Sequence, residues 1–119
     1  MEGAIRSHKD LLVWQKSMSF VVEVYETTKN FPKEEIYGLT NQLRRAAVSI
    51  PSNIAEGFNR GSQKEKAQFL RIAYGSTSEI ETQLLISRNL GFVSGDQSAA
   101  LISSLNEISR MLNVIVRKI

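Results

Sequence analysis

The stretch Leu101–Ile119, LISSLNEISRMLNVIVRKI, decides the fold class of this chain. Its apolar residues recur at alternating spacings of four and three positions: Leu101, Leu105, Ile108, Leu112, Ile115 and Ile119. A heptad repeat of this kind puts every apolar side chain on one stripe of an α-helix, where another helix can bury it. Ser94 and Gln97 form a capping box before the stretch, so we expect a helix over residues 95–118.

A second helix-forming segment precedes this one and covers residues 63–90. Ser62 and Glu65 form a capping box at its start, and Gly91 follows its end. Its apolar face is expected to hold two neighbouring rows, namely Phe69, Ala73, Ile80 and Leu84 with Leu70, Tyr74, Thr77 and Leu85. We therefore interpret Tyr74 as a packing residue and not as a platform for stacking a base.

The segment of residues 33–57 is predicted to be a further helix. Pro32 suits a first helical turn, and Gly57 suits a C-terminal cap. Pro51 removes one backbone hydrogen bond inside the helix, and we expect a bend there without a break. The expected core stripe is Ile36, Leu39, Leu43, Ala46, Ala47, Ile50 and Ile54.

The remaining helix is expected over residues 11–29, with an unusually wide apolar arc. Its stripe is Trp14, Met18, Val21 and Tyr25, and Val13, Phe20 and Val24 extend the stripe sideways. Trp14 is interpreted as a packing residue. Because the arc is wider than contact with one neighbouring helix requires, a further surface is expected to cover part of it. Four helices with short connections predict an all-α, antiparallel up-down-up-down four-helix bundle as a single domain over residues 1–119, assembling with copies of itself.

Composition excludes several classes of function. The chain has 119 residues, 42% of them hydrophobic and 23% charged, and it has no cysteine, so disulfides, thiolate metal sites and thiol nucleophiles are excluded. No apolar run is long enough to span a membrane, and the N-terminal residues lack the pattern of an export signal. We expect a cytoplasmic protein with no membrane partner.

Catalytic and cofactor sites are not expected either. The single histidine, His8, lies outside the predicted helices in a segment expected to be mobile, which leaves neither a His-containing metal site nor a Ser-His-Asp triad. Glycine-rich phosphate loops are absent, since GFNRG at residues 57–61 matches no nucleotide fingerprint. Glu56 and Glu79 are interpreted as structural pairing residues. The prediction is no catalytic residue, no metal and no cofactor.

Positive charge is concentrated in one part of the sequence. The formal net charge is +3, and the segment between Arg44 and Arg71 holds six basic and two acidic residues. The rest of the chain holds nine basic and ten acidic residues, so the whole excess lies in that segment. The candidate nucleic-acid-binding residues are therefore Arg44, Arg45, Arg60, Lys64, Lys66 and Arg71.

Two groups of polar residues at helical spacing leave alternatives open. Lys64, Gln68, Arg71 and Gly75 share a helix face that a phosphate backbone could approach closely, or the charges are only solvated and Gly75 permits helix packing. Arg44 and Arg45 point about 100° apart on a helix, so each needs its own partner. The face that holds Arg45, Ser49, Ser52 and Glu56 suits either a network between subunits or a binding surface.

The amino-acid sequences of two segments resemble those of a known family. FPKEEIYGLTNQLRRAAVSIPSNIAEG at residues 31–57 and FLRIAYGSTSEIETQL at residues 69–84 are similar to the four-helix-bundle proteins encoded by intervening sequences within large-subunit ribosomal RNA genes. The likeness covers about Leu11 to Ile115. It joins a YxLxxQLRRAxxSIxxNIAEG pattern to a GSxxE segment in the same order.

This resemblance implies a homo-oligomeric ring, typically a pentamer. It also implies a shape related to the accessory proteins of diversity-generating retroelements, which bind nucleic acid and a reverse transcriptase. On this likeness Arg44, Arg45 and the basic residues of the third helix form a positive surface, and residues 53–57, NIAEG, are a structural signature. The expected function is non-enzymatic binding of RNA or DNA. The alternative is a protein-interaction scaffold, such as a reverse-transcriptase-type accessory subunit, without direct contact to nucleic acid.

Overall fold

A computed structural model describes residues 5–119 of the chain and contains only helical elements in that range. In order they are η1 (His8–Asp10), α1 (Leu12–Thr28), η2 (Lys33–Tyr37), α2 (Leu39–Phe58), α3 (Gln63–Asn89) and α4 (Gly95–Arg117). Here α marks an α-helix and η a short 3₁₀-helix. The predicted all-α class with four long helices is confirmed.

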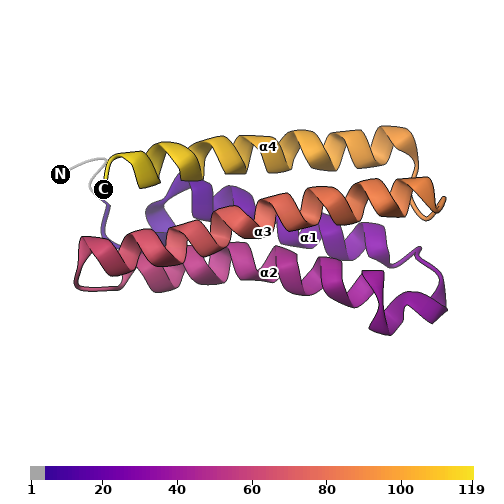
Figure 1. Cartoon of the computed structure of the whole chain (residues 1–119), viewed down its shortest axis with the longest axis horizontal. Coiled ribbons are helices and arrows are strands. Elements are labelled where there is room, and N and C mark those ends of the chain that lie inside the picture. The colour runs from indigo at the N-terminus through magenta and orange to yellow at the C-terminus, as the bar shows by residue number, and fades with distance from the viewer. Residues whose placement is uncertain (1–4) are drawn as a thin grey trace.

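The four α-helices lie side by side along the long axis of a molecule that measures 47 × 26 × 20 Å (Figure 1). The colours of Figure 1 show that the chain reverses direction at each connection between them. The start of the described chain, the C-terminus and the α2–α3 connection lie at one end of the molecule, on the left of the view. η2 and the α3–α4 connection lie at the opposite end.

The hydrophobic core lies between the four helices. Its largest fully buried side chains are Phe20, Leu43, Ile50, Ile54, Ile80, Leu84, Leu105, Ile108 and Leu112. The heptad stripe of α4 is buried from Leu101 to Leu112 as predicted, whereas Ile115 is half-buried and Ile119 is exposed. Hydrophobic burial at these positions holds the helices together, because each fully buried aliphatic side chain contributes about 1.5 to 3 kcal/mol.

The stripe predicted for α1 is wrong in part, although Val13, Phe20 and Val24, which were expected to extend it sideways, are buried as predicted. Met18 and Tyr25 are exposed, and the buried positions are Val13, Ser17, Phe20, Val24, Thr27 and Thr28. Trp14 and Val21 are half-buried at the edge of the core. Three of the buried residues are polar, and hydroxyls such as that of Ser17, which donates to the carbonyl oxygen of Trp14 at 2.9 Å, are satisfied inside the helix. Because three buried positions are polar, the spacing of apolar residues alone did not identify the buried face of α1.

The predicted helix of residues 33–57 is two elements. The chain forms η2 first and then turns at Gly38, after which α2 begins at Leu39. The carboxylate of Glu35 accepts a hydrogen bond from the backbone N–H of Leu39 at 3.0 Å and so caps the start of α2. Ile36, predicted to lie in the core, is 49% exposed.

The C-terminal half of α2 also differs from the prediction at one glycine. Pro51 lies inside α2, which continues without a break to Phe58 as expected. Gly57 is part of the helix and does not cap it. A Cβ atom there would lie 3.0 Å from the Cβ of Phe69 and 3.1 Å from the carbonyl oxygen of Lys66, so Gly57 permits the close approach of α3 to α2.

The ends of α3 and α4 follow the predicted signals. The hydroxyl of Ser62 accepts a hydrogen bond from the N–H of Glu65 at 3.1 Å, and that of Ser94 accepts one from the N–H of Gln97 at 3.0 Å. Gly91, with a φ of 80°, follows the end of α3 in the left-handed conformation that favours glycine. Tyr74, predicted to pack in the core, is instead 39% exposed.

Candidate nucleic-acid interface

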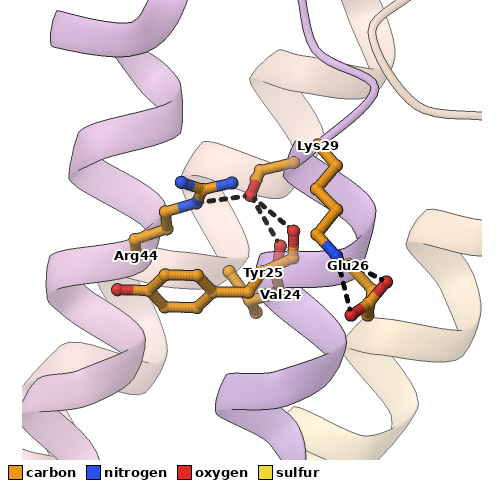
Figure 2. Close-up of polar contacts among 6 residues, drawn as sticks. Val24, Tyr25, Glu26, Lys29 and Arg44 are labelled. Carbon is orange, nitrogen blue, oxygen red and sulfur yellow. Dashed lines mark hydrogen bonds and ion pairs between the residues drawn. The ribbon is translucent and has the colours of Figure 1, made fainter.

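Arg44 is held between α1 and α2 by contacts within the protein. Its Nε donates a hydrogen bond to the hydroxyl of Thr28 at 2.8 Å, and that hydroxyl donates to the carbonyl oxygen of Val24 at 2.8 Å. The guanidinium carbon lies 4.5 Å from the centre of the Tyr25 ring, a cation–π contact (Figure 2). Its two outer nitrogens make no contact drawn in Figure 2. Arg44 is thus a packing residue whose two outer NH₂ groups can still donate hydrogen bonds to an anion.

Thr28→Val tests how firmly this contact joins the helices. The substitution keeps the shape of the buried side chain but removes the acceptor of the Arg44 Nε, and we expect the free energy of unfolding to fall by about 1 kcal/mol. Urea unfolding followed by circular dichroism measures the change. Thr82→Val, at an exposed threonine of α3, is the matched control and should change the free energy of unfolding very little.

Arg45 lies on the outward face of α2, exposed and about 100° around the helix from Arg44. Ser52 and Glu56 are exposed on the same face, but Ser49 is turned toward α3, where its hydroxyl lies 2.9 Å from that of Ser76. The amide nitrogen of Asn53 donates to the carbonyl oxygen of Ser49 at 2.8 Å. The predicted polar face therefore divides into an exposed part and a part that joins α2 to α3.

Arg60 and Lys66 are engaged by neighbouring side chains. Arg60 forms ion pairs with Glu56 at 3.5 Å and with Glu65 at 3.8 Å, and its guanidinium carbon lies 4.8 Å from the centre of the Phe69 ring. The pairing predicted for Glu56 is present. Lys66 is half-buried, and its ammonium nitrogen lies 5.1 Å from the centre of the Phe58 ring at the end of α2.

Lys64 and Arg71 lie on the outward face of α3 and are exposed, together with Gln68 and Gly75. Neither cation forms an ion pair within residues 5–119. They are seven residues apart on one helix, which separates them by about 10 Å along its axis. A Cβ atom at Gly75 would meet no atom within 4 Å, so Gly75 does not serve the packing of the helices in this subunit.

The six predicted residues do not form one patch. Arg45 and Phe58 are thirteen residues apart on α2, so Arg44 and Arg45 lie about 20 Å along the helix from its end. Arg60, Lys64 and Lys66 lie at that end, in the α2–α3 connection and the first turn of α3, and Arg71 follows them along α3. The fold therefore groups four of the six residues and places the other two apart.

The fold adds cations to this group that the sequence analysis missed. Ile5, Leu11, Gln63, Lys66 and Lys118 line one common cavity, which places the N-terminal segment, the start of α3 and the end of α4 together. We define the basic end by the seven cations of the segments that meet at this cavity: Arg6, Lys9, Arg60, Lys64, Lys66, Arg117 and Lys118. Three separate segments contribute them. Four of these cations were not predicted. Short connections between helices of similar length bring the start and the end of the chain to the same end of the bundle as the α2–α3 connection, and this signal could have identified them.

Carboxylates at the basic end are occupied by local contacts. An oxygen of Asp10 accepts hydrogen bonds from the N–H groups of Arg6 at 2.9 Å and Ser7 at 3.3 Å. Glu56 and Glu65 both pair with one arginine, as described above. The seven cations outnumber these three carboxylates, so the end as a whole presents a positive potential.

Other ionisable groups lie outside this interface. Lys16 of α1 and Glu107 of α4 form an ion pair, and the hydrogen bond and the charge of Lys16 lower the pKa of Glu107. Glu79, predicted to pair structurally, accepts a hydrogen bond from the amide of Gln83 at 3.2 Å. His8, predicted to be mobile, lies in η1 with its ring 5.3 Å from that of Trp14. Within residues 5–119 no three histidine or acidic side chains converge on a possible metal site.

Apolar side chains also form an exposed groove on the side of the molecule. We define the α1–α2 groove by Trp14, Met18, Val21, Val48, Pro51 and Ala55, which line a cavity of about 380 Å³ together with His8 and Ser52. Met18 is 43% and Val48 is 39% exposed. Trp14, Met18 and Val21 of the stripe predicted for the first helix thus line this groove at the edge of the core.

These features define an all-α protein of four long helices with a basic end and an apolar side groove. The sequence matches the family described as 23S rRNA-intervening sequence protein over residues 9–114, and the chain belongs to this family. A crystal structure of a protein of unknown function from the S23 ribosomal protein family of Bacteroides thetaiotaomicron is similar, with a TM-score of 0.80 and 24% identity over 88% of this chain and 98% of that chain. This likeness shows the fold.

No protein with a curated description is similar to this chain. Within residues 5–119 no helix is both long and apolar enough to cross a bilayer.

Proposed function

We propose that this protein is a non-enzymatic, cytoplasmic homo-oligomer of antiparallel four-helix subunits that binds RNA through its basic end and Arg71. The observation that supports RNA binding most directly is the grouping of seven cations from three segments at one end, six of which form no ion pair within residues 5–119, with Arg71 extending the group along α3. Lysine and arginine side chains without carboxylate partners attract a phosphate backbone irrespective of its sequence.

One face of α3 offers a path for a phosphate backbone, whereas the description of the family, 23S rRNA-intervening sequence protein, names no ligand. Lys64 and Arg71 could contact phosphates in succession along the helix face, and the bare backbone at Gly75 leaves room for the strand to approach. Arg44 and Arg45 stand apart from this surface and would contact a different part of the ligand or a neighbouring subunit.

Self-association is the second part of the proposal. The α1–α2 groove exposes apolar side chains that a neighbouring copy would cover, in agreement with the wide apolar arc of the first helix. The resemblance to ring-forming proteins supports a closed ring, with a pentamer as the expected form. A ring would repeat the basic end around its axis and so multiply weak phosphate contacts.

The test of RNA binding is its dependence on salt. We expect the affinity for a mixed RNA to fall steeply as salt rises, and the double variant Lys64→Gln/Arg71→Gln to reduce the slope of log affinity against log salt by about 1.5, since each phosphate contact contributes roughly 0.7 to 0.9. Fluorescence anisotropy at several salt concentrations measures the slope. Arg88→Gln, which removes an exposed cation at the other end of α3, is the matched control and should leave it unchanged.

A slope that stays the same in the double variant would contradict phosphate contact by Lys64 and Arg71. Absence of binding at low salt would contradict RNA binding altogether. The engagement of Arg44 and Arg60 by the protein's own side chains favours the alternative of a protein-interaction scaffold. Recovery of a protein partner from the native host after nuclease treatment would support that alternative.

A further inference from the structure

η2 presents two large apolar side chains to solvent at the end of the molecule that lies opposite the termini. Tyr37 is 90% and Ile36 is 49% exposed, and the neighbouring Glu34 is also exposed. We define these three residues as the η2 knob. A tyrosine beside an exposed aliphatic side chain is typical of the centre of a protein contact, where aromatic residues contribute most of the binding free energy.

The η2 knob is fixed in place on both sides. The side chain of Glu35 bonds to the N–H of Leu39 at 3.0 Å, and the N–H of Gly38 donates to the carbonyl oxygen of Glu35 at 2.9 Å. A Cβ atom at Gly38 would lie 2.6 Å from that Glu35 carboxylate, so glycine is needed for this turn. Before the knob, the ring of buried Phe31 packs 5.6 Å from that of Phe92. A fixed knob loses little conformational entropy when it binds.

A pocket of about 300 Å³ lies at the opposite end of the molecule, between the two terminal segments, the end of α2 and the start of α3. Its apolar lining is Ile5, Leu11, Val13, Ile54, Phe58, Leu70, Ile115 and Ile119. Three polar residues complete the lining: Gln63, Lys66 and Lys118. We call this the end pocket. Its two ammonium groups form no ion pair within residues 5–119.

We infer that the end pocket of one copy of this protein receives the η2 knob of a second copy. The aromatic ring of Tyr37 suits an apolar pocket of this volume, which is at the small end of the range for binding pockets. Its hydroxyl can bond to the amide of Gln63 at the polar part of the lining. Glu34 brings a carboxylate to the lysines of the pocket, and η2 as a whole, with Lys33, Glu34 and Glu35, has a net charge of −1, so the two surfaces agree in size, polarity and charge.

This contact can only form between molecules. The knob and the pocket lie at opposite ends of the long axis (Figure 1), so one subunit cannot join them. Each copy that has donated its knob still has an open pocket, and the contact therefore propagates from end to end. It differs from side-by-side contact through the α1–α2 groove, and it is small enough to be weak for a single pair of subunits.

Cysteine crosslinking tests the contact directly, because the natural chain has no cysteine. Glu34→Cys protein mixed with Lys118→Cys protein is treated with a short bismaleimide, and we expect a crosslinked pair that neither protein forms alone. The control mixture combines Glu34→Cys with Arg88→Cys, since Arg88 is exposed near the end of α3 where η2 also lies. A greater yield with Arg88→Cys than with Lys118→Cys indicates side-by-side contact of the knob and overturns the inference.

The two apolar partners are then tested separately. Tyr37→Ala in the Glu34→Cys protein, and Gln63→Trp in the Lys118→Cys protein to obstruct the pocket, are each expected to reduce the crosslinked yield at least ten-fold. Leu90→Ala, at a residue that is 57% exposed outside both surfaces, should leave the yield unchanged. Both tested side chains are exposed, so folding is not at risk. An unchanged yield in the Tyr37→Ala protein overturns the inference.

Discussion

Gly57→Leu is expected to destabilise the protein by about 3 kcal/mol, near the upper end of the effects of overpacking. Even the first atom of the new side chain would lie 3.0 Å from the Cβ of Phe69 and 3.1 Å from the carbonyl oxygen of Lys66. Both atoms belong to the first turns of α3 and cannot rotate away. The helices α2 and α3 would have to separate, which exposes the core beside Ile54. Urea unfolding followed by circular dichroism measures the loss.

Gly75→Ala is the matched control at a second helical glycine. A Cβ atom there meets nothing within 4 Å, and alanine is more favourable than glycine inside a helix by about 0.5 to 1 kcal/mol. The free energy of unfolding should therefore rise by about that amount. If Gly57→Leu is as stable as the natural protein, α2 and α3 do not approach as closely at Gly57 as the structure indicates.

The fold class could be predicted because apolar residues repeat at helical spacing where the helices are regular. The heptad stripe of α4 is the clearest case, and its residues from Leu101 to Leu112 are buried. The capping residues Ser62 and Ser94 mark the starts of α3 and α4, and Gly91 marks the end of α3. Each of these signals depends on only a few neighbouring atoms. Such signals are readable without knowledge of the neighbouring helices.

The errors lie where contacts between helices override local pattern. Buried Ser17, Thr27 and Thr28 satisfy their hydroxyls by hydrogen bonds, so they occupy positions that the pattern assigned to apolar residues. Gly57 was assigned to a cap because its partner on α3 cannot be known from local sequence. The turn at Gly38 depends on the carboxylate of Glu35, which accepts a hydrogen bond from the N–H of Leu39. In the sequence alone, Glu35 equally suits the first turn of a helix.

The candidate interface was only partly predictable for a similar reason. Clustering along the sequence identified Lys64 and Arg71, which are exposed, but it also selected Arg44, which packs on Tyr25. It missed Arg6 and Lys118, because the ends of a chain come together with its middle only in the folded bundle. Charge density along the sequence is therefore a weak guide to charge density on a surface.

Val48→Glu is expected to dissociate the proposed oligomer into subunits. Val48 is 39% exposed in the subunit, so the carboxylate is solvated in the free subunit and costs little stability there. In the oligomer a neighbouring copy would remove that water, and burial of an unpaired charge should weaken association by about 3 kcal/mol or more, which is roughly a hundred-fold in affinity. Light scattering after gel filtration at micromolar concentration measures the mass.

Asn41→Glu is the matched control, because it adds the same charge to an exposed position of α2 outside the groove and should leave the mass unchanged. A natural protein that is monomeric, or a Val48→Glu protein of the same mass as the natural one, would contradict assembly through the groove. The groove lies on the side of the bundle and the η2 knob at its end. Val48→Glu should therefore leave the crosslink between the knob and the end pocket intact, which separates the two contacts.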